Sequence, residues 1–206
     1  MTHTPEDQAP RHGVIVLAAG SSRRLGKAKA LIEVDGETLV HRAVRFALET
    51  APFDCIVVSA EGDPRIPAAV ADLACRITPC ADARRGMSVS LQAGLRSLAA
   101  ECEAALIVLT DQPALTSRHL CALRDAWCKQ PANAAASGYA ETIGVPAILP
   151  RRWFKDLIDR DNDHGARDLL RARKDEVCVI AAPSLASDID TEADLARLEF
   201  TTSTKR

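Results

Sequence analysis

The sequence predicts an α/β fold of three layers, α/β/α, with a mostly parallel sheet and an irregular, partly antiparallel C-terminal part. Continuous apolar runs rich in β-branched residues at 13–17 and 104–110 are typical of strands buried on both faces. Between them, apolar pairs at 39/40, 43/44 and 47/48 recur at the spacing of a helix. Alternating strands and helices imply βαβ units, and therefore a Rossmann-like arrangement.

The remaining elements follow from the same patterns. We expect further strands at 55–58, 76–78, 134–137, 145–149 and 177–181, and helices within 64–73, 91–98, 120–127 and from 191 onward. The last two strands before residue 150 are the ones expected to run antiparallel. No linker or repeat interrupts the chain, so residues 13–200 are expected to form one domain between disordered tails at 1–12 and 201–206.

Composition excludes several classes of protein. Apolar residues make up 47% and charged residues 26%, as in an ordinary globular protein. A net charge of −2 and only 3% aromatic residues argue against a nucleic-acid-binding surface. The early apolar run at 14–19 is too short to span a membrane, and the polar N-terminus is unlike a signal peptide. Seven cysteines without a C-x-x-C pair suggest reduced core thiols, and hence a cytoplasmic protein.

The loop 17–29, directly after the first strand, has the composition of a phosphate-binding loop. Gly20 lets the backbone approach an anion, while Arg24 and Lys29 supply positive charge. It is not a P-loop, because five residues separate Gly20 from Gly26 and the next two are Lys-Ala. The dinucleotide fingerprint G-x-G-x-x-G is also absent. A solvated basic loop that only joins strand to helix remains the alternative.

Three further segments carry candidate site residues. Asp111, after the second buried strand, could hold Mg²⁺, although Asp and Pro are also common in turns. Gly86 and Ser88 could provide the entry and N-cap of a helix, whose exposed N–H groups could bind a nucleotide. Asp188 and Asp190 are two residues apart, so either could be a second metal ligand; equally, Asp190 or Thr191 could simply cap the final helix.

Taken together, these segments resemble the MobA-like nucleotidyltransferases of molybdenum-cofactor maturation, nearest to the molybdenum cofactor cytidylyltransferases. The family loop L-A-A-G-x-S-x-R-M-G-x-x-K is matched by Leu17, Ala18, Ala19, Gly20, Ser22, Arg24, Gly26 and Lys29. Leu25 and Ala28 depart from it, where Met and Pro are usual. The resemblance runs from about residue 13 to residue 198 and includes the segments 86–95, 109–113, 144–146, 163–167 and 188–191.

The resemblance implies Mg²⁺-dependent transfer of a nucleoside monophosphate to a phosphate-bearing acceptor. The implied catalytic residues are Arg24, Lys29 and Asp111, and the implied metal ligands are Asp111 and Asp190. Leu17, Ala18, Ala19, Gly20, Ser22 and Ser88 would join Arg24, Lys29 and Asp111 around the nucleotide, and Gly144, Pro146, Asp163 and Arg167 would contact the acceptor.

The implied partners are a nucleoside triphosphate and a molybdopterin-like acceptor, together with transient contact to a molybdoenzyme or maturation factor. Ala19 favours CTP, because Leu-Ala-Ala-Gly is typical of the pyrimidine-nucleotide users. Two alternatives stay open: a sugar- or polyol-phosphate acceptor, and a nucleotide-binding partner without catalytic activity.

Overall fold

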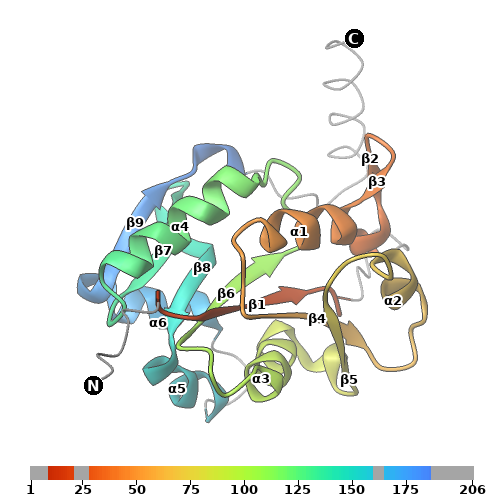
Figure 1. Ribbon diagram of the computed structural model, residues 1–206, viewed down its shortest axis with the longest axis horizontal. Coiled ribbons are helices and arrows are strands. Elements are labelled where there is room, and N and C mark those ends of the chain that lie inside the picture. The colour runs from red at the N-terminus through yellow and green to blue at the C-terminus, as the bar shows by residue number, and fades with distance from the viewer. Residues whose placement is uncertain (1–8, 21–27, 160–164, 187–206) are drawn as a thin grey trace, which may run out of the picture.

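The computed structural model describes residues 9–20, 28–159 and 165–186, and its centre is one seven-stranded sheet (Figure 1). The strand order is β5-β4-β1-β6-β8-β7-β9. The strands are β1 (His12–Leu17), β4 (Asp54–Ala60), β5 (Arg76–Cys80), β6 (Ala104–Leu109), β7 (Ala134–Tyr139), β8 (Thr142–Pro150) and β9 (Val177–Ala181). Residues of β1 and β6 are buried along their whole length, as expected for the apolar runs that predicted them.

The sheet is parallel except at β8. Strands β1, β4, β5 and β6 pair in parallel, whereas β8 runs antiparallel to both β6 and β7. β8 runs antiparallel to β7 because only Ala140 and Glu141 join the two strands, and both residues have positive φ, as in a type I′ hairpin. β9 returns parallel to β7. The mostly parallel sheet with an antiparallel C-terminal part is therefore confirmed.

Helices cover both faces of the sheet, which confirms the three layers. They are α1 (Leu39–Leu48), α2 (Arg65–Ala69), α3 (Met87–Ser97), α4 (Ser117–Lys129), α5 (Phe154–Ile158) and α6 (Ala166–Ala172). One apolar core lies between the sheet and α1, α2 and α4, and a second lies between the sheet and α3, α5 and α6 (Figure 1). None of the helices in the described part of the chain is long and apolar enough to cross a membrane.

Several sequence predictions need correction. His12 is buried and begins β1, although the sequence placed it in the N-terminal tail. The small hairpin of β2 (Glu33–Val34) and β3 (Glu37–Thr38) was not expected, because two-residue strands are too short to show alternation. Its turn contains Asp35 and Gly36, both with positive φ. The last helix, expected from residue 191, lies outside the described residues.

The cysteines only partly match the prediction. All seven are free thiols, and Cys55, Cys80 and Cys102 are buried in the core. Cys178 is exposed, because it lies on the edge strand β9, which pairs only with β7. The expectation of core thiols is therefore wrong for Cys178, whose apolar neighbours in the sequence are partly exposed as well.

Candidate active site

The strand order creates a switch point beside β1. From β1 the chain passes to β4 and β5 on one side, and then crosses to β6 on the other side of β1. In open α/β sheets, a crevice for ligands opens at such a point, outside the carboxyl ends of the strands. The phosphate-like loop after β1 and the segment after β6 that contains Asp111 both begin at this crevice.

The backbone at the mouth of the crevice is held by three strands. Ala18 N–H donates to the carbonyl oxygen of Val58 on β4 at 2.9 Å. On the other side, the Thr110 hydroxyl lies 3.5 Å from the carbonyl oxygen of Leu17. Thr110 and Ala18 are both buried, so the first residues of the loop have little freedom to move.

A cavity of about 260 Å³ opens at this point, and we call it the first cavity. Its lining includes six of the predicted site residues: Leu17, Ala18, Ala19, Gly20, Lys29 and Asp111. They come from three separate segments: the end of β1, the 3-10 helix at Lys29–Leu31, and the residues after β6. The geometry thus brings together the predicted phosphate loop and the predicted metal ligand.

The charges in the first cavity suit an anionic ligand that carries a metal ion. Of the described residues that line it, Asp111 is the one acid, and Lys29 and Arg84 are the cations. Among the described residues, no cluster of three or more His, Cys, Asp or Glu side chains could hold a metal by itself. An ion bound by Asp111 would need oxygen atoms from a substrate as well, which is the usual mode of Mg²⁺ binding.

Other predicted residues do not meet there. Ser88 is buried in the first turn of α3 and does not line the first cavity; its neighbours Gly86, Met87 and Ser90 do. The prediction that Ser88 caps this helix is wrong, because Gly86 is the N-cap residue, with a φ of 132°. Four other residues predicted to bind nucleotide, metal or acceptor lie outside the described residues: Ser22, Arg24, Asp163 and Asp190.

Gly144, Val145 and Pro146 are buried on β8, between β6 and β7, and we call this segment, with the side chains that bond to it, the acceptor-side wall because Gly144 and Pro146 were predicted to contact the acceptor. The pairing of β8 with β7 shifts register between Ala136 and Ser137, which leaves a bulge at Val145 and Pro146. The Val145 carbonyl oxygen accepts two hydrogen bonds, from Tyr139 Oη at 2.8 Å and from Gln112 Nε2 at 3.2 Å. Because Gln112 directly follows Asp111, the wall is tied to the predicted metal ligand.

A second pair of buried groups fixes Pro146. The Ser137 hydroxyl donates to the Pro146 carbonyl oxygen at 2.6 Å, so its oxygen accepts from His119 Nε2, which lies 2.8 Å away. Burial lowers the pKa of His119, which is consistent with a neutral ring protonated on Nε2. This chain of bonds connects α4 to the bulge of β8.

Arg167 reaches the same wall from α6. A Cβ built on Gly144 would lie 2.7 Å from Tyr139 Oη and 3.6 Å from Arg167 Nε, so both side chains occupy the space beside this glycine. Gly144 and Arg167 therefore lie side by side, but neither they nor Pro146 line the first cavity. The contact with Tyr139 was not foreseen from the sequence.

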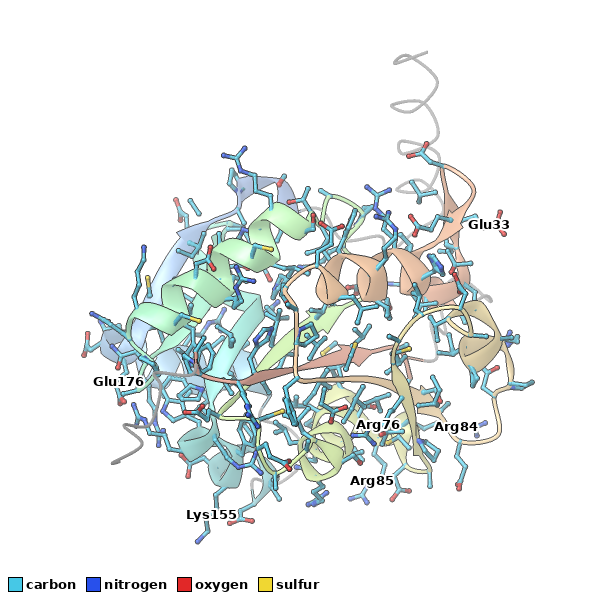
Figure 2. The ribbon with its side chains drawn as sticks, in the orientation of Figure 1. Glu33, Arg76, Arg84, Arg85, Lys155 and Glu176 are labelled. Carbon is cyan, nitrogen blue, oxygen red and sulfur yellow. The ribbon has the colours of Figure 1, made fainter. Side chains whose placement is uncertain are left out.

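Sequence reasoning also missed Arg84, which lies on the 3-10 helix Ala83–Arg85 between β5 and α3 (Figure 2). Arg84 lines the first cavity and also a second, adjoining cavity of about 520 Å³. The second cavity shares Ala18, Ala19, Gly20 and Ala83 with the first and is otherwise lined largely by residues 60–65, at the end of β4 and directly after it. The sequence feature that could have indicated Arg84 is the pair of arginines, Arg84 and Arg85, just before Gly86.

Comparison with known proteins agrees with this geometry. The sequence model of the family described as the MobA-like NTP transferase domain matches residues 14–177. The chain therefore belongs to the MobA-like NTP transferase family, a family of nucleotidyltransferases. The matched region contains every residue that lines the first cavity.

Individual relatives are distant. The chain is 26% identical to the molybdenum cofactor guanylyltransferase of Rhodobacter capsulatus over 196 residues, 90% of this chain and 93% of the relative. It is 26% identical to the purine catabolism protein PucB of Bacillus subtilis (strain 168) over 166 residues, 77% of this chain and 80% of that one. The fold is similar to a crystal structure of Rv0371C from Mycobacterium tuberculosis H37Rv in complex with manganese, with a TM-score of 0.73 and 22% identity over 93% of this chain and 98% of the other.

Proposed function

We propose that this protein transfers a nucleoside monophosphate, CMP from CTP, to the phosphate of a molybdopterin-like acceptor and releases pyrophosphate, using Mg²⁺. One observation carries the proposal: the loop Ala18–Gly20, Lys29 and Asp111 line a single cavity at the switch point of the sheet. The Rhodobacter relative, named for the molybdenum cofactor, supports the acceptor. Its name also indicates GTP, whereas Ala19 favours CTP, so both nucleotides belong in the test. The cytoplasm is the proposed location.

Asp111 fits a divalent cation, because its carboxylate supplies the hard oxygen ligand that Mg²⁺ prefers and lies in the same cavity as Lys29. When bound, Mg²⁺ would neutralise part of the charge on the phosphate oxygens. Asp190 is proposed as a second ligand. Arg24 is proposed to stabilise the phosphates with Lys29.

The proposed reaction needs no covalent nucleophile on the protein. A phosphate oxygen of the acceptor forms a bond to the α-phosphorus, and the bond from that phosphorus to the oxygen bridging to the β-phosphate breaks. The electron pair of that bond leaves with pyrophosphate. The protein contributes by holding the two substrates in line and by placing cations where negative charge develops. Lys29, within the first cavity, would neutralise charge on the leaving pyrophosphate.

The acceptor would lie between the first cavity and the acceptor-side wall. Gln112 connects the two, since it follows Asp111 and donates to the Val145 carbonyl oxygen. Arg167, beside Gly144, could pair with an anionic group of the acceptor. Fixing the wall by four hydrogen bonds would keep the acceptor oxygen in position for attack.

The test measures pyrophosphate release from CTP and GTP, with Mg²⁺, in the presence of molybdopterin or of a panel of sugar and polyol phosphates. We expect release with CTP and molybdopterin only. Preference for GTP would overturn the choice of base, and preference for a sugar or polyol phosphate would overturn the acceptor. Nucleotide binding without release with any acceptor would favour a non-catalytic partner in molybdoenzyme maturation.

Asp111→Asn tests the metal ligand. This change keeps the shape of the side chain and should remove most activity, because an amide binds Mg²⁺ far more weakly than a carboxylate. Asp82→Asn is the matched control, since Asp82 is exposed at the same edge of the sheet but lines neither cavity. Activity of Asp111→Asn close to that of Asp82→Asn would contradict the assignment.

A further inference from the structure

Arg84 lies on the border between the two cavities. Both are lined by Ala18, Ala19, Gly20, Ala83 and Arg84, and of these described residues Arg84 alone carries a charge. The start of the predicted phosphate loop and Arg84 therefore line the same border between the cavities. A ligand long enough to enter both cavities would have to pass this point.

No acid among the described residues forms an ion pair with Arg84. Arg65, the other arginine of the second cavity, donates to Asp63 through Nε at 2.9 Å and Nη2 at 2.8 Å. Arg85, next in the chain, lies 3.6 Å from Asp82. Within the part of the chain that the structure describes, Arg84 has no carboxylate at ion-pair distance, and its side chain is exposed. Its hydrogen-bond donors are therefore not committed to a described acid.

The two cavities differ in chemistry in a way that orients a nucleotide. The first cavity holds Lys29 and Asp111, which suit phosphates and a metal ion. The second contains Glu61 and Asp63, of which Asp63 is paired with Arg65; Glu61 disfavours a phosphate, and both carboxylates can accept hydrogen bonds from sugar hydroxyl or base amino groups. At about 520 Å³, the second cavity is within the usual size range of small-molecule sites. The nucleoside end thus fits the second cavity, and the outer phosphates fit the first.

We propose that Arg84 binds the α-phosphate of the nucleotide, the group that joins these two ends. This inference rests on the proposed function. It adds Arg84 as a residue that contacts the phosphate at which the reaction takes place. A guanidinium can donate two parallel hydrogen bonds to the non-bridging oxygens of one phosphate. Arg84 stays protonated throughout, while the acceptor oxygen bonds to the α-phosphorus and pyrophosphate leaves. Because negative charge builds on those oxygens during transfer, Arg84 stabilises the transition state more than the bound substrate.

The test compares Arg84→Gln with Arg85→Gln, two exposed neighbours on one short helix of which only Arg84 lines a cavity. Binding of cytidine, CMP and CTP with Mg²⁺ is measured by calorimetry, with the guanosine series in parallel. Arg84→Gln should weaken binding of CMP and CTP by the same factor, about 10- to 100-fold, because a charge-assisted pair is lost. Cytidine binding should not change, and Arg84→Lys should recover part of the loss. Arg85→Gln should match the wild type, and thermal melts should show that all variants are folded.

Three results would overturn the inference. Equal affinities of Arg84→Gln and Arg85→Gln for CMP would show that Arg84 does not touch the α-phosphate. A loss for CTP but not for CMP would move Arg84 to the outer phosphates. Failure of the wild-type protein to bind any nucleotide would overturn the proposed function, and the role of Arg84 with it, so the two failures can be told apart.

Discussion

Replacing Gly144 with alanine tests the acceptor-side wall directly. The new methyl carbon would lie 2.7 Å from Tyr139 Oη and 3.3 Å from Tyr139 Cζ, well inside contact distance. The Tyr139 ring cannot easily move away, because the residue is only 9% exposed and its hydroxyl donates to the Val145 carbonyl oxygen. Overpacking of this kind costs about 1–3 kcal/mol, and losing the hydrogen bond adds about 1 kcal/mol. We therefore expect Gly144→Ala to lower the free energy of unfolding by about 2–4 kcal/mol.

A double-mutant cycle with Tyr139→Phe sharpens this prediction. Tyr139→Phe alone should cost about 1 kcal/mol, since the Val145 carbonyl oxygen keeps its bond from Gln112. In the double variant the hydroxyl oxygen is gone, and the nearest ring atom is at 3.3 Å, so only a small shift is needed. The double variant should therefore lose at least about 1 kcal/mol less than the sum of the two single changes.

Urea unfolding, followed by circular dichroism with a common m-value, measures all four proteins. Additivity within about 0.5 kcal/mol would refute the reasoning, because it would mean that the methyl group does not meet the hydroxyl. Gly165→Ala is the control, since a Cβ there meets no described atom within 4 Å. If the wall serves the acceptor, Gly144→Ala should raise the KM for the acceptor and leave nucleotide affinity unchanged.

Two further predictions concern stability. Burial, with a smaller contribution from a nearby arginine, lowers the pKa of His12 from 6.5 to about 4, so the unfolded chain binds a proton before the folded protein does. The contribution of His12 to the free energy of unfolding is fully present above pH 6.5 and decreases as the pH drops toward 4. Between pH 8 and pH 5 the loss is about 2 kcal/mol. His12→Gln should flatten that part of the stability curve in urea titrations, and an unchanged slope would contradict the assignment. Gly94→Ala should destabilise by about 1–2 kcal/mol despite the better helix propensity of alanine, because its Cβ would lie 2.6 Å from Ile15 Cγ2 in the core. A gain in stability in the same assay would show that β1 and α3 can separate.

The His12 prediction depends on contacts that join distant parts of the chain. His12 Nε2 lies 2.9 Å from Thr50 Oγ1, which itself donates to the Ala47 carbonyl oxygen at 2.7 Å, so His12 is the donor. The ring of Trp127 on α4 meets the His12 ring edge-on, with centroids 6.3 Å apart. The positive charge that further lowers the pKa of His12 belongs to Arg124, one turn earlier on α4. A histidine next to a polar tail gives no sign of this environment in the sequence.

The sequence by itself determined the central strands and the position of the first cavity. Apolar runs that are rich in β-branched residues leave few alternatives to buried strands, and the carboxyl ends of parallel strands meet at one edge. That rule alone places Asp111 across from Gly20, and the structure confirms that both line one cavity. The sequence patterns also place the antiparallel part of the sheet in the C-terminal part of the chain.

Only the tertiary structure decided the contacts that depend on register and packing. Arg84 resembles any surface arginine until the short helix that carries it packs beside Ala18–Gly20. Gly144 and Tyr139 meet because the two-residue turn pairs Tyr139 with Thr142, which places Gly144 diagonally opposite Tyr139, and one residue of slip would point their side chains elsewhere. Local patterns specify strands and helices, since they depend on near neighbours in the chain. The residues that surround a ligand are brought together by contacts between segments that are distant in the sequence, and a local sequence pattern does not predict such contacts.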